Sequence, residues 1–134
     1  MRDGGFPVEM ISGVPVVAAP EEIDITNAEE LSSALLAAAA GGHGTLVADM
    51  TRTWFCDSSA LHVLLTAHKR AQAEGGELLL VAPGAAVLRI FAVTGVDRMF
   101  RNFASLSAAL AHASPNGSSG SSGSNGDRRP DDGT

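Results

Sequence analysis

The run Asp57-Ser58-Ser59 stands directly before the most regular apolar pattern in the chain. Asp and Ser side chains at such a place accept hydrogen bonds from the free N–H groups of a helix, so all three residues can serve as caps. A serine hydroxyl there can also accept a phosphoryl group, because the free N–H groups and the positive end of the helix dipole tolerate the added charge. The residues alone leave both interpretations open: helix caps only, or a regulatory phosphorylation site.

Ser58 and His62 also raise the chemistry of a small hydrolase, since a nucleophile and a base four residues apart on a helix approach one another. A catalytic triad further needs an orienting acid and an oxyanion hole, and the sequence contains no Gly-x-Ser-x-Gly elbow. We therefore expect a protein that is not an enzyme. His62 is interpreted as a solvated residue of a helix face that lies near Ser58.

Other residues that could carry chemistry give weaker signals. His62 and His68 are six residues apart, do not share a helix face, and so fail the spacing of metal ligands. Cys56 has no cation beside it in sequence and is expected to be a small buried hydrophobic residue. Trp54 and Phe55 fit either an exposed apolar patch for a partner or, in the case of Phe55, a place in the core.

The element that must position Ser58 is a helix over residues 59–74, which ends at Gly75-Gly76. One arc of this helix is apolar, which predicts a buried face, and the opposite arc is polar. The apolar arc consists of Ala60, Val63, Leu64, Ala67 and Ala71, and the polar arc of His62, Thr66 and Lys69.

Short strands and further helices surround this helix. We expect a hairpin of residues 7–11 and 14–18, with Pro15 at a sheet edge or at the start of its strand because proline donates no hydrogen bond. Thr26 and Glu29 form a capping-box pattern, which predicts a helix with apolar positions Ala28, Leu31, Leu35, Leu36 and Ala39 that ends at Gly41-Gly42. The remaining expectations are strands at 45–48, 77–81 and Met99-Phe100, and helices at 85–93, closed by Gly95, and 105–112.

Strands that alternate with helices predict an α/β domain with a mixed sheet and about four helices: the N-terminal hairpin is antiparallel and the later strands run parallel. The domain is expected to cover residues 1–113, since residues 114–134 contain no Val, Ile, Leu or Phe and predict a disordered Ser/Gly-rich tail. No phosphate-cradling Gly-rich motif occurs, so no nucleotide cofactor is expected.

Composition narrows the functional classes. The 134 residues carry a net charge of −6, and the expected domain a net −5, without a cluster of Lys and Arg, which argues against direct binding of nucleic acid. Apolar runs are too short to cross a membrane. One cysteine and the absence of an export signal favour the cytoplasm.

Four segments together resemble the bacterial anti-sigma-factor antagonists, which are single STAS domains. Asp57-Ser58-Ser59 before a Leu-rich helix is similar to the family's phosphorylation motif, and Glu22-Ile23-Asp24 to its Glu-hydrophobic-Asp loop. Gly75-Gly76-Glu77-Leu78 is similar to its helix-to-strand turn, and residues 87–96 to its third helix and following turn. These segments follow the family's order and cover about residues 8–112.

The resemblance implies a mechanism of partner switching in bacterial transcription, as in stress responses. The unphosphorylated protein would bind an anti-sigma factor, which would then release its sigma factor. The anti-sigma factor would itself be a serine protein kinase, with its own ATP and Mg²⁺, and its phosphorylation of Ser58 would abolish binding. A phosphatase would remove the phosphate and reset the switch. Asp24, Asp57, Ser59, Ala60 and His62 would join Ser58 in contacting the partner, and the domain would need no cofactor or metal of its own.

Two positions depart from the family pattern: Ala60 stands where the family usually has Gly, and Glu21 replaces the usual Gly before Glu22. Ala is at least as favourable as Gly in a helix, so the fold should not suffer. A methyl group at Ala60 could still alter the fit to a particular kinase. The alternative function is a STAS scaffold or ligand-sensing subunit without a kinase cycle.

Overall fold

The computed structural model describes residues 6–40 and 44–113. Five strands form the main sheet in the order β1-β2-β4-β6-β7, and two further strands, β3 and β5, pair separately. The strands are β1 (Val8–Ile11), β2 (Val14–Ala18), β3 (Glu22–Ile23), β4 (Leu46–Asp49), β5 (Phe55–Cys56), β6 (Leu78–Val81) and β7 (Arg101–Phe103). The α-helices are α1 (Ala28–Ala39), α2 (Ser58–Ala73), α3 (Ala85–Thr94) and α4 (Leu106–Ala113), and a short 3-10 helix spans Val96–Arg98.

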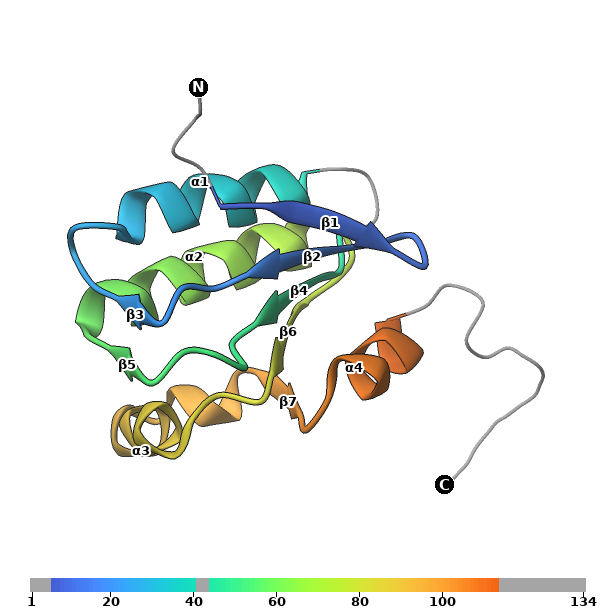
Figure 1. Cartoon of the computed structure of the whole chain (residues 1–134). Coiled ribbons are helices and arrows are strands. Elements are labelled where there is room, and N and C mark those ends of the chain that lie inside the picture. The colour runs from blue at the N-terminus through green and yellow to red at the C-terminus, as the bar shows by residue number, and fades with distance from the viewer. Residues whose placement is uncertain (1–5, 41–43, 114–134) are drawn as a thin grey trace.

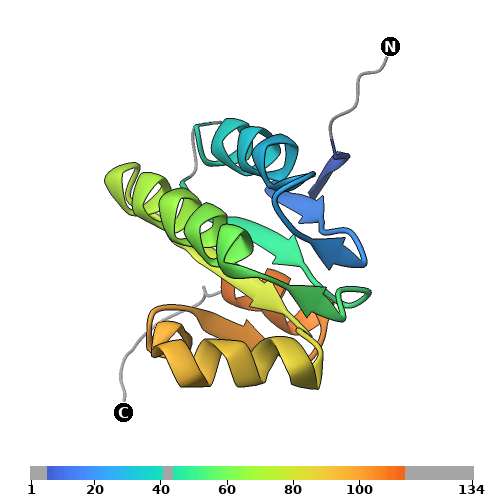
Figure 2. The same ribbon diagram turned by 90° about the vertical axis from the view of Figure 1, so that its left-hand side faces the viewer.

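This arrangement confirms the predicted mixed α/β sheet with four helices. β1 and β2 form an antiparallel hairpin, whereas β2, β4, β6 and β7 run parallel to their neighbours. Helices α1 and α2 lie side by side on one face of the sheet, and α4 packs on the other (Figures 1 and 2). The buried residues of α3, Val87 and Phe91, belong to the same core as α1 and α2.

The two central strands carry most of the burial. Every residue from Leu78 to Val81 and from Leu46 to Ala48 is at most 1% exposed, as is typical of parallel strands covered on both faces. The strands predicted at 45–48 and 77–81 are confirmed within one residue. The predicted apolar arc of the long helix is confirmed as well, since Ala60, Val63, Leu64, Ala67 and Ala71 are all buried.

Three local predictions are wrong. Pro15 lies in β2, an interior strand, and is tolerated because the parallel ladder with β4 begins only at Val16. The capping box does not form: α1 begins at Ala28 behind Asn27, and the Thr26 hydroxyl donates to the Asp24 carboxylate instead. The last strand is Arg101–Phe103 rather than Met99-Phe100.

The shift of the last strand has a structural cause. The 3-10 helix occupies Val96–Arg98, directly before the predicted strand. Phe100 then turns into the core, where its ring centroid lies 6.2 Å from that of Phe91. In α1, Ala38 is buried while Leu36 is only half-buried. Gly41-Gly42 and the tail predicted at 114–134 lie outside the described residues. None of the helices within the described ranges is long and apolar enough to cross a membrane.

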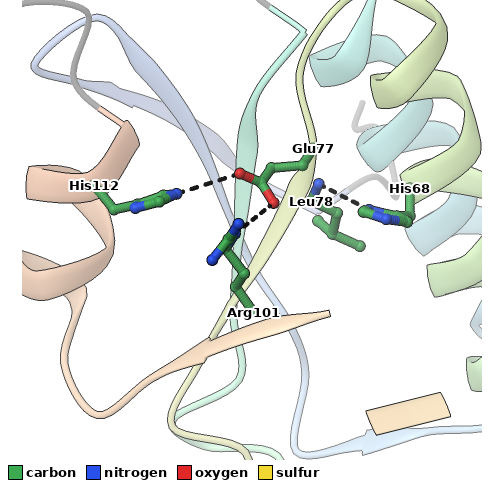
Figure 3. Close-up of polar contacts among 5 residues, drawn as sticks. All are labelled: His68, Glu77, Leu78, Arg101 and His112. Atoms are coloured by element: carbon green, nitrogen blue, oxygen red, sulfur yellow. Dashed lines mark hydrogen bonds and ion pairs between the residues drawn. The ribbon is translucent and has the colours of Figure 1, made fainter. Parts of the chain in front are cut away.

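His68 ties α2 to the start of β6. Its ring is 5% exposed, and Nδ1 accepts a hydrogen bond of 3.2 Å from the Leu78 backbone N–H (Figure 3). The ring also meets Phe100 edge-on at 5.2 Å between centroids. Because burial disfavours the charged imidazolium, the pKa of His68 is lowered, although nearby Glu77 opposes the shift. The neutral ring is therefore the form that fits the fold.

Two glycines follow α2, and a different constraint favours glycine at each: the backbone conformation at Gly75 and the lack of space for a side chain at Gly76. Gly75 has φ +90°, which favours glycine, yet a Cβ there would meet no atom within 4 Å. A Cβ on Gly76 would lie 2.2 Å from the Thr45 backbone nitrogen. Gly76 therefore allows the α2–β6 turn to approach the segment that leads into β4.

Replacing Gly76 by Ala should lower the free energy of unfolding by about 3 kcal/mol or more, because backbone atoms must move. Gly75→Ala, the matched control, should lower it by only about 1 kcal/mol through the left-handed backbone conformation. Urea unfolding of both variants measures the difference. Equal losses would contradict the close approach at Gly76.

The stability of the protein should decrease as the pH falls below about 6.5, the ordinary pKa of histidine. The unfolded chain then binds a proton that folded His68 does not, and the loss levels off once the pH is below the lowered pKa. Thermal unfolding at pH 5 to 7.5 measures the effect. His68→Gln should reduce the dependence of the melting temperature on pH. His62→Gln, which alters an exposed histidine of the same helix, should leave that dependence unchanged. If His68→Gln also leaves it unchanged, His68 is not the group responsible.

Candidate functional site

The pairing of β3 with β5 builds the predicted site. Ile23 lies opposite Cys56 in this parallel pair, and the Asp57 N–H donates to the Ile23 carbonyl at 3.1 Å. Ile23 and Cys56 are both buried, which anchors the pair to the core. The residues that follow the two strands, Asp24 and Asp57, therefore leave the sheet at the same end. Two segments that the resemblance treats as separate motifs thus converge.

Asp57 alone caps α2. Its backbone is extended, and its Oδ1 accepts a hydrogen bond of 2.8 Å from the Ser59 N–H. Ser58 is the first residue of α2; it is exposed, and Ser59 is half-buried. No hydrogen bond involves either serine hydroxyl within the described part of the chain. Of the three residues that could cap the helix, only the aspartate is used for it.

A groove of about 530 Å³ lies between the first turns of α1 and α2. It brings Ser58, Ser59 and His62 together, as the sequence predicts for one helix face. The groove is lined by Ile25, Ala28, Glu29, Ser32, Ser58, Ser59, His62 and Val63. Sequence reasoning missed the contribution of α1, although Ile25, an isolated apolar residue in a polar loop, was a usable signal. Ile25 is 78% exposed.

Asp24 and Ala60 do not line this groove. The Asp24 carboxylate accepts hydrogen bonds from the Thr26 hydroxyl and N–H, and these bonds lower its pKa. Its carbonyl accepts from the Asn27 and Ala28 N–H groups. Asp24 thereby shapes the start of α1. Ala60 is fully buried, so its methyl group packs inside the domain rather than on the surface.

Trp54 and Phe55 form an apolar patch beside the β3–β5 pair. Their side chains are 56% and 41% exposed, and their ring centroids lie 6.0 Å apart. The structure thus decides between the two sequence interpretations, because neither ring is in the core. The Trp54 N–H donates to the Glu21 carbonyl, and the Glu21 side chain pairs with Arg52 at 3.5 Å.

The chemistry available at the groove is limited. Glu29 is its one carboxylate, and no Lys or Arg is among its lining residues. Cys56 is buried and its pKa is raised to about 11, mainly by burial, so it remains a protonated thiol. Ser58 and His62 share the groove without a hydrogen bond between them, and Asp57 is engaged with Ser59. Across residues 6–40 and 44–113, no three His, Cys, Asp or Glu residues gather as metal ligands.

Asp57→Ala should lower the free energy of unfolding by about 1 kcal/mol, because the Ser59 N–H loses its acceptor. Asp57→Asn retains a side-chain oxygen and should preserve most of the stability. Chemical denaturation monitored by circular dichroism compares the two variants. If Asn destabilises as much as Ala, the cap is not the source of the effect.

Comparison with solved structures places this geometry among known folds. An anti-sigma factor antagonist from Mycobacterium paratuberculosis is 32% identical with a TM-score of 0.72, over 81% of this chain and 92% of that chain. The anti-sigma factor antagonist SpoIIAA in its unphosphorylated form is 23% identical, with a TM-score of 0.64 over 81% of this chain and 95% of that chain. The Bacillus cell fate determinant SpoIIAA in the phosphorylated form is 22% identical, with a TM-score of 0.63 over 81% and 98%.

At 23% and 22% identity, the two SpoIIAA structures support a shared fold and nothing further. No curated protein sequence matches the chain. The family model described as STAS domain matches residues 6–109, which include both strands of the β3–β5 pair, the groove and all four α-helices up to Ala109 in α4. The chain therefore belongs to the STAS domain family.

Proposed function

We propose that this protein is an anti-sigma factor antagonist whose binding to an anti-sigma factor is controlled by phosphorylation of Ser58. The observation that carries the proposal is the position of the Ser58 side chain. It lies at the first position of α2 and lines a surface groove, while Asp57 takes over the capping of the helix. A hydroxyl that the fold does not use can be modified without loss of a structural hydrogen bond.

The similarity to solved antagonists supports the role. The relative from Mycobacterium paratuberculosis, at 32% identity, carries this description, and the more distant SpoIIAA was solved in both phosphorylation states. In the proposed cycle the anti-sigma factor is a serine protein kinase that supplies ATP and Mg²⁺, and a phosphatase resets the switch. The chain itself contributes no catalytic group, and the exchange takes place in the bacterial cytoplasm.

Electrostatics explains how one phosphate would act as a switch. A phosphoserine carries about −1.5 to −2 charges at neutral pH. The groove offers Glu29 but no Lys or Arg, so the phosphate would have only the helix N-terminus and the ring of His62 to stabilise it. Burying such a charge in an interface without a cationic partner costs several kcal/mol. Unphosphorylated Ser58, the groove and the patch of Trp54 and Phe55 would form the surface that the anti-sigma factor contacts.

A STAS scaffold or ligand-sensing subunit without a kinase cycle is the alternative. Mass spectrometry after incubation with the purified anti-sigma factor and ATP separates the two. The proposed function requires one added phosphate on the peptide that contains Ser58, whereas the alternative leaves the peptide unmodified.

Ser58→Ala should bind the anti-sigma factor at least as tightly as the wild type and never be released by ATP. Ser58→Asp should bind roughly a hundredfold more weakly, because a charge is buried in the interface. Ser33→Asp is the matched control: it adds the same charge on the exposed side of α1 and should change the affinity by less than about threefold. Titration calorimetry measures all three affinities.

Equal binding by Ser58→Ala and Ser58→Asp would refute the role of Ser58. A loss of the same size for Ser33→Asp would show that net charge, rather than the position of the charge, weakens the complex. Melting temperatures of the variants exclude unfolding as the cause.

A further inference from the structure

A second pocket lies at the opposite end of α2 from Ser58. Its volume is about 440 Å³, and α2, the turn into β6 and the chain before and within β7 all contribute to it. The lining residues that matter here are His68, Gln72, Glu77, Arg98, Phe100 and Arg101. Since α2 rises about 1.5 Å per residue, His68 stands roughly 15 Å along the helix from Ser58. The pocket is therefore separate from the groove.

The acidic residue of this pocket is already neutralised. Glu77 accepts a hydrogen bond from Arg101 Nε at 3.1 Å through Oε1, and its Oε2 lies 3.3 Å from His112 Nε2 (Figure 3). Arg98 also lines the pocket, and it forms no ion pair with any residue of the described ranges. The local balance of charge is thus positive in a chain with a net charge of −6.

His68 lines the same pocket and carries a buried donor. Because Nδ1 accepts the Leu78 N–H, the proton of the neutral ring must reside on Nε2. The side chain is 5% exposed, and within residues 6–40 and 44–113 no acceptor for the Nε2–H is found. Buried donors without a partner are rare in folded proteins. An acceptor atom of a ligand in the pocket would complete the hydrogen bonding of the ring.

We propose that this pocket binds a small organic anion, with its anionic oxygens held by Arg98 and the Nε2–H of His68 and its apolar part against Phe100. Guanidinium groups and N–H donors are the groups that proteins use for carboxylates and phosphates. The volume is within the range of roughly 300–1,000 Å³ typical of ligand sites and exceeds what a bare inorganic anion needs. A carboxylate and a phosphate monoester supply the same acceptor oxygens.

Three probes with the same aromatic body test the proposal on the full-length protein. Phenyl phosphate and benzoate carry the two anionic groups, and benzyl alcohol carries none. In titrations monitored by ¹⁵N NMR, one or both anions should shift the backbone amides of residues 98–101 and 76–78 in a saturable way, with little change at Ser58. The comparison of the two anions identifies the preferred head group.

Arg98→Gln should weaken binding of the preferred anion by roughly tenfold or more, as expected for the loss of a charge-assisted hydrogen bond. Arg89→Gln is the matched control, since it removes the same charge from the exposed surface of α3 outside the pocket, and should change the affinity by less than about twofold. Both substitutions alter exposed side chains, so both variants should fold.

Saturable shifts that depend on Arg98 but not on Arg89 support the proposal. It is overturned if neither anion shifts the pocket amides at millimolar concentration, if benzyl alcohol binds as well as the anions, or if both arginine variants weaken binding equally. None of these outcomes depends on the phosphorylation of Ser58, so this inference and the proposed function can fail independently.

Discussion

The parallel pairing of β4 with β6 is the constraint on which the rest of the structure depends. Four consecutive residues of each strand pair in register, from Leu46 with Leu78 to Asp49 with Val81. Parallel neighbours cannot be joined by a tight turn, so the chain must cross over the sheet, and α2 is that crossover. Its N-terminus consequently lies at the carboxyl edge of the sheet, where α/β proteins usually place functional residues. Its C-terminus lies at the opposite edge, where His68 meets β6.

The crossover and its strands could be predicted because their signals are local. A run such as Leu78–Val81, bounded by glycine and proline, has few alternatives to a buried strand, and the spacing of Ala60, Val63, Leu64 and Ala67 fits only one buried helix face. The core tolerates shifts of one residue at the ends of these elements. For this reason the sequence predicts the fold class, the position of Ser58 at the start of the helix, and the residues that can cap that helix.

Other features depend on contacts between residues distant in sequence, for which the chain carries no periodic signal. The β3–β5 pair consists of two residues on each side, too short to produce an alternating pattern, yet it brings Asp24 and Asp57 to one end. The Thr26 pattern failed for a related reason: the Asp24 carboxylate, two residues away, competes for the hydroxyl that a capping box would use. Ile25 hints at the α1 side of the groove, but the contributions of Glu29 and Ser32 depend on how α1 and α2 pack against one another.

The two ends of α2 differ in charge, and this difference bears on what each can bind. At the N-terminal end the groove contains a carboxylate and no Lys or Arg, and Asp57 already accepts the Ser59 N–H. A phosphate on Ser58 would therefore meet few compensating groups within the domain and would act mainly on whatever contacts the groove. At the C-terminal end the carboxylate of Glu77 is paired and Arg98 lines an adjoining pocket. The side chains around the groove thus add nothing to the stabilisation that the helix N-terminus gives a phosphate, whereas the side chains around the second pocket are net positive. One helix can therefore serve both functions at its two ends.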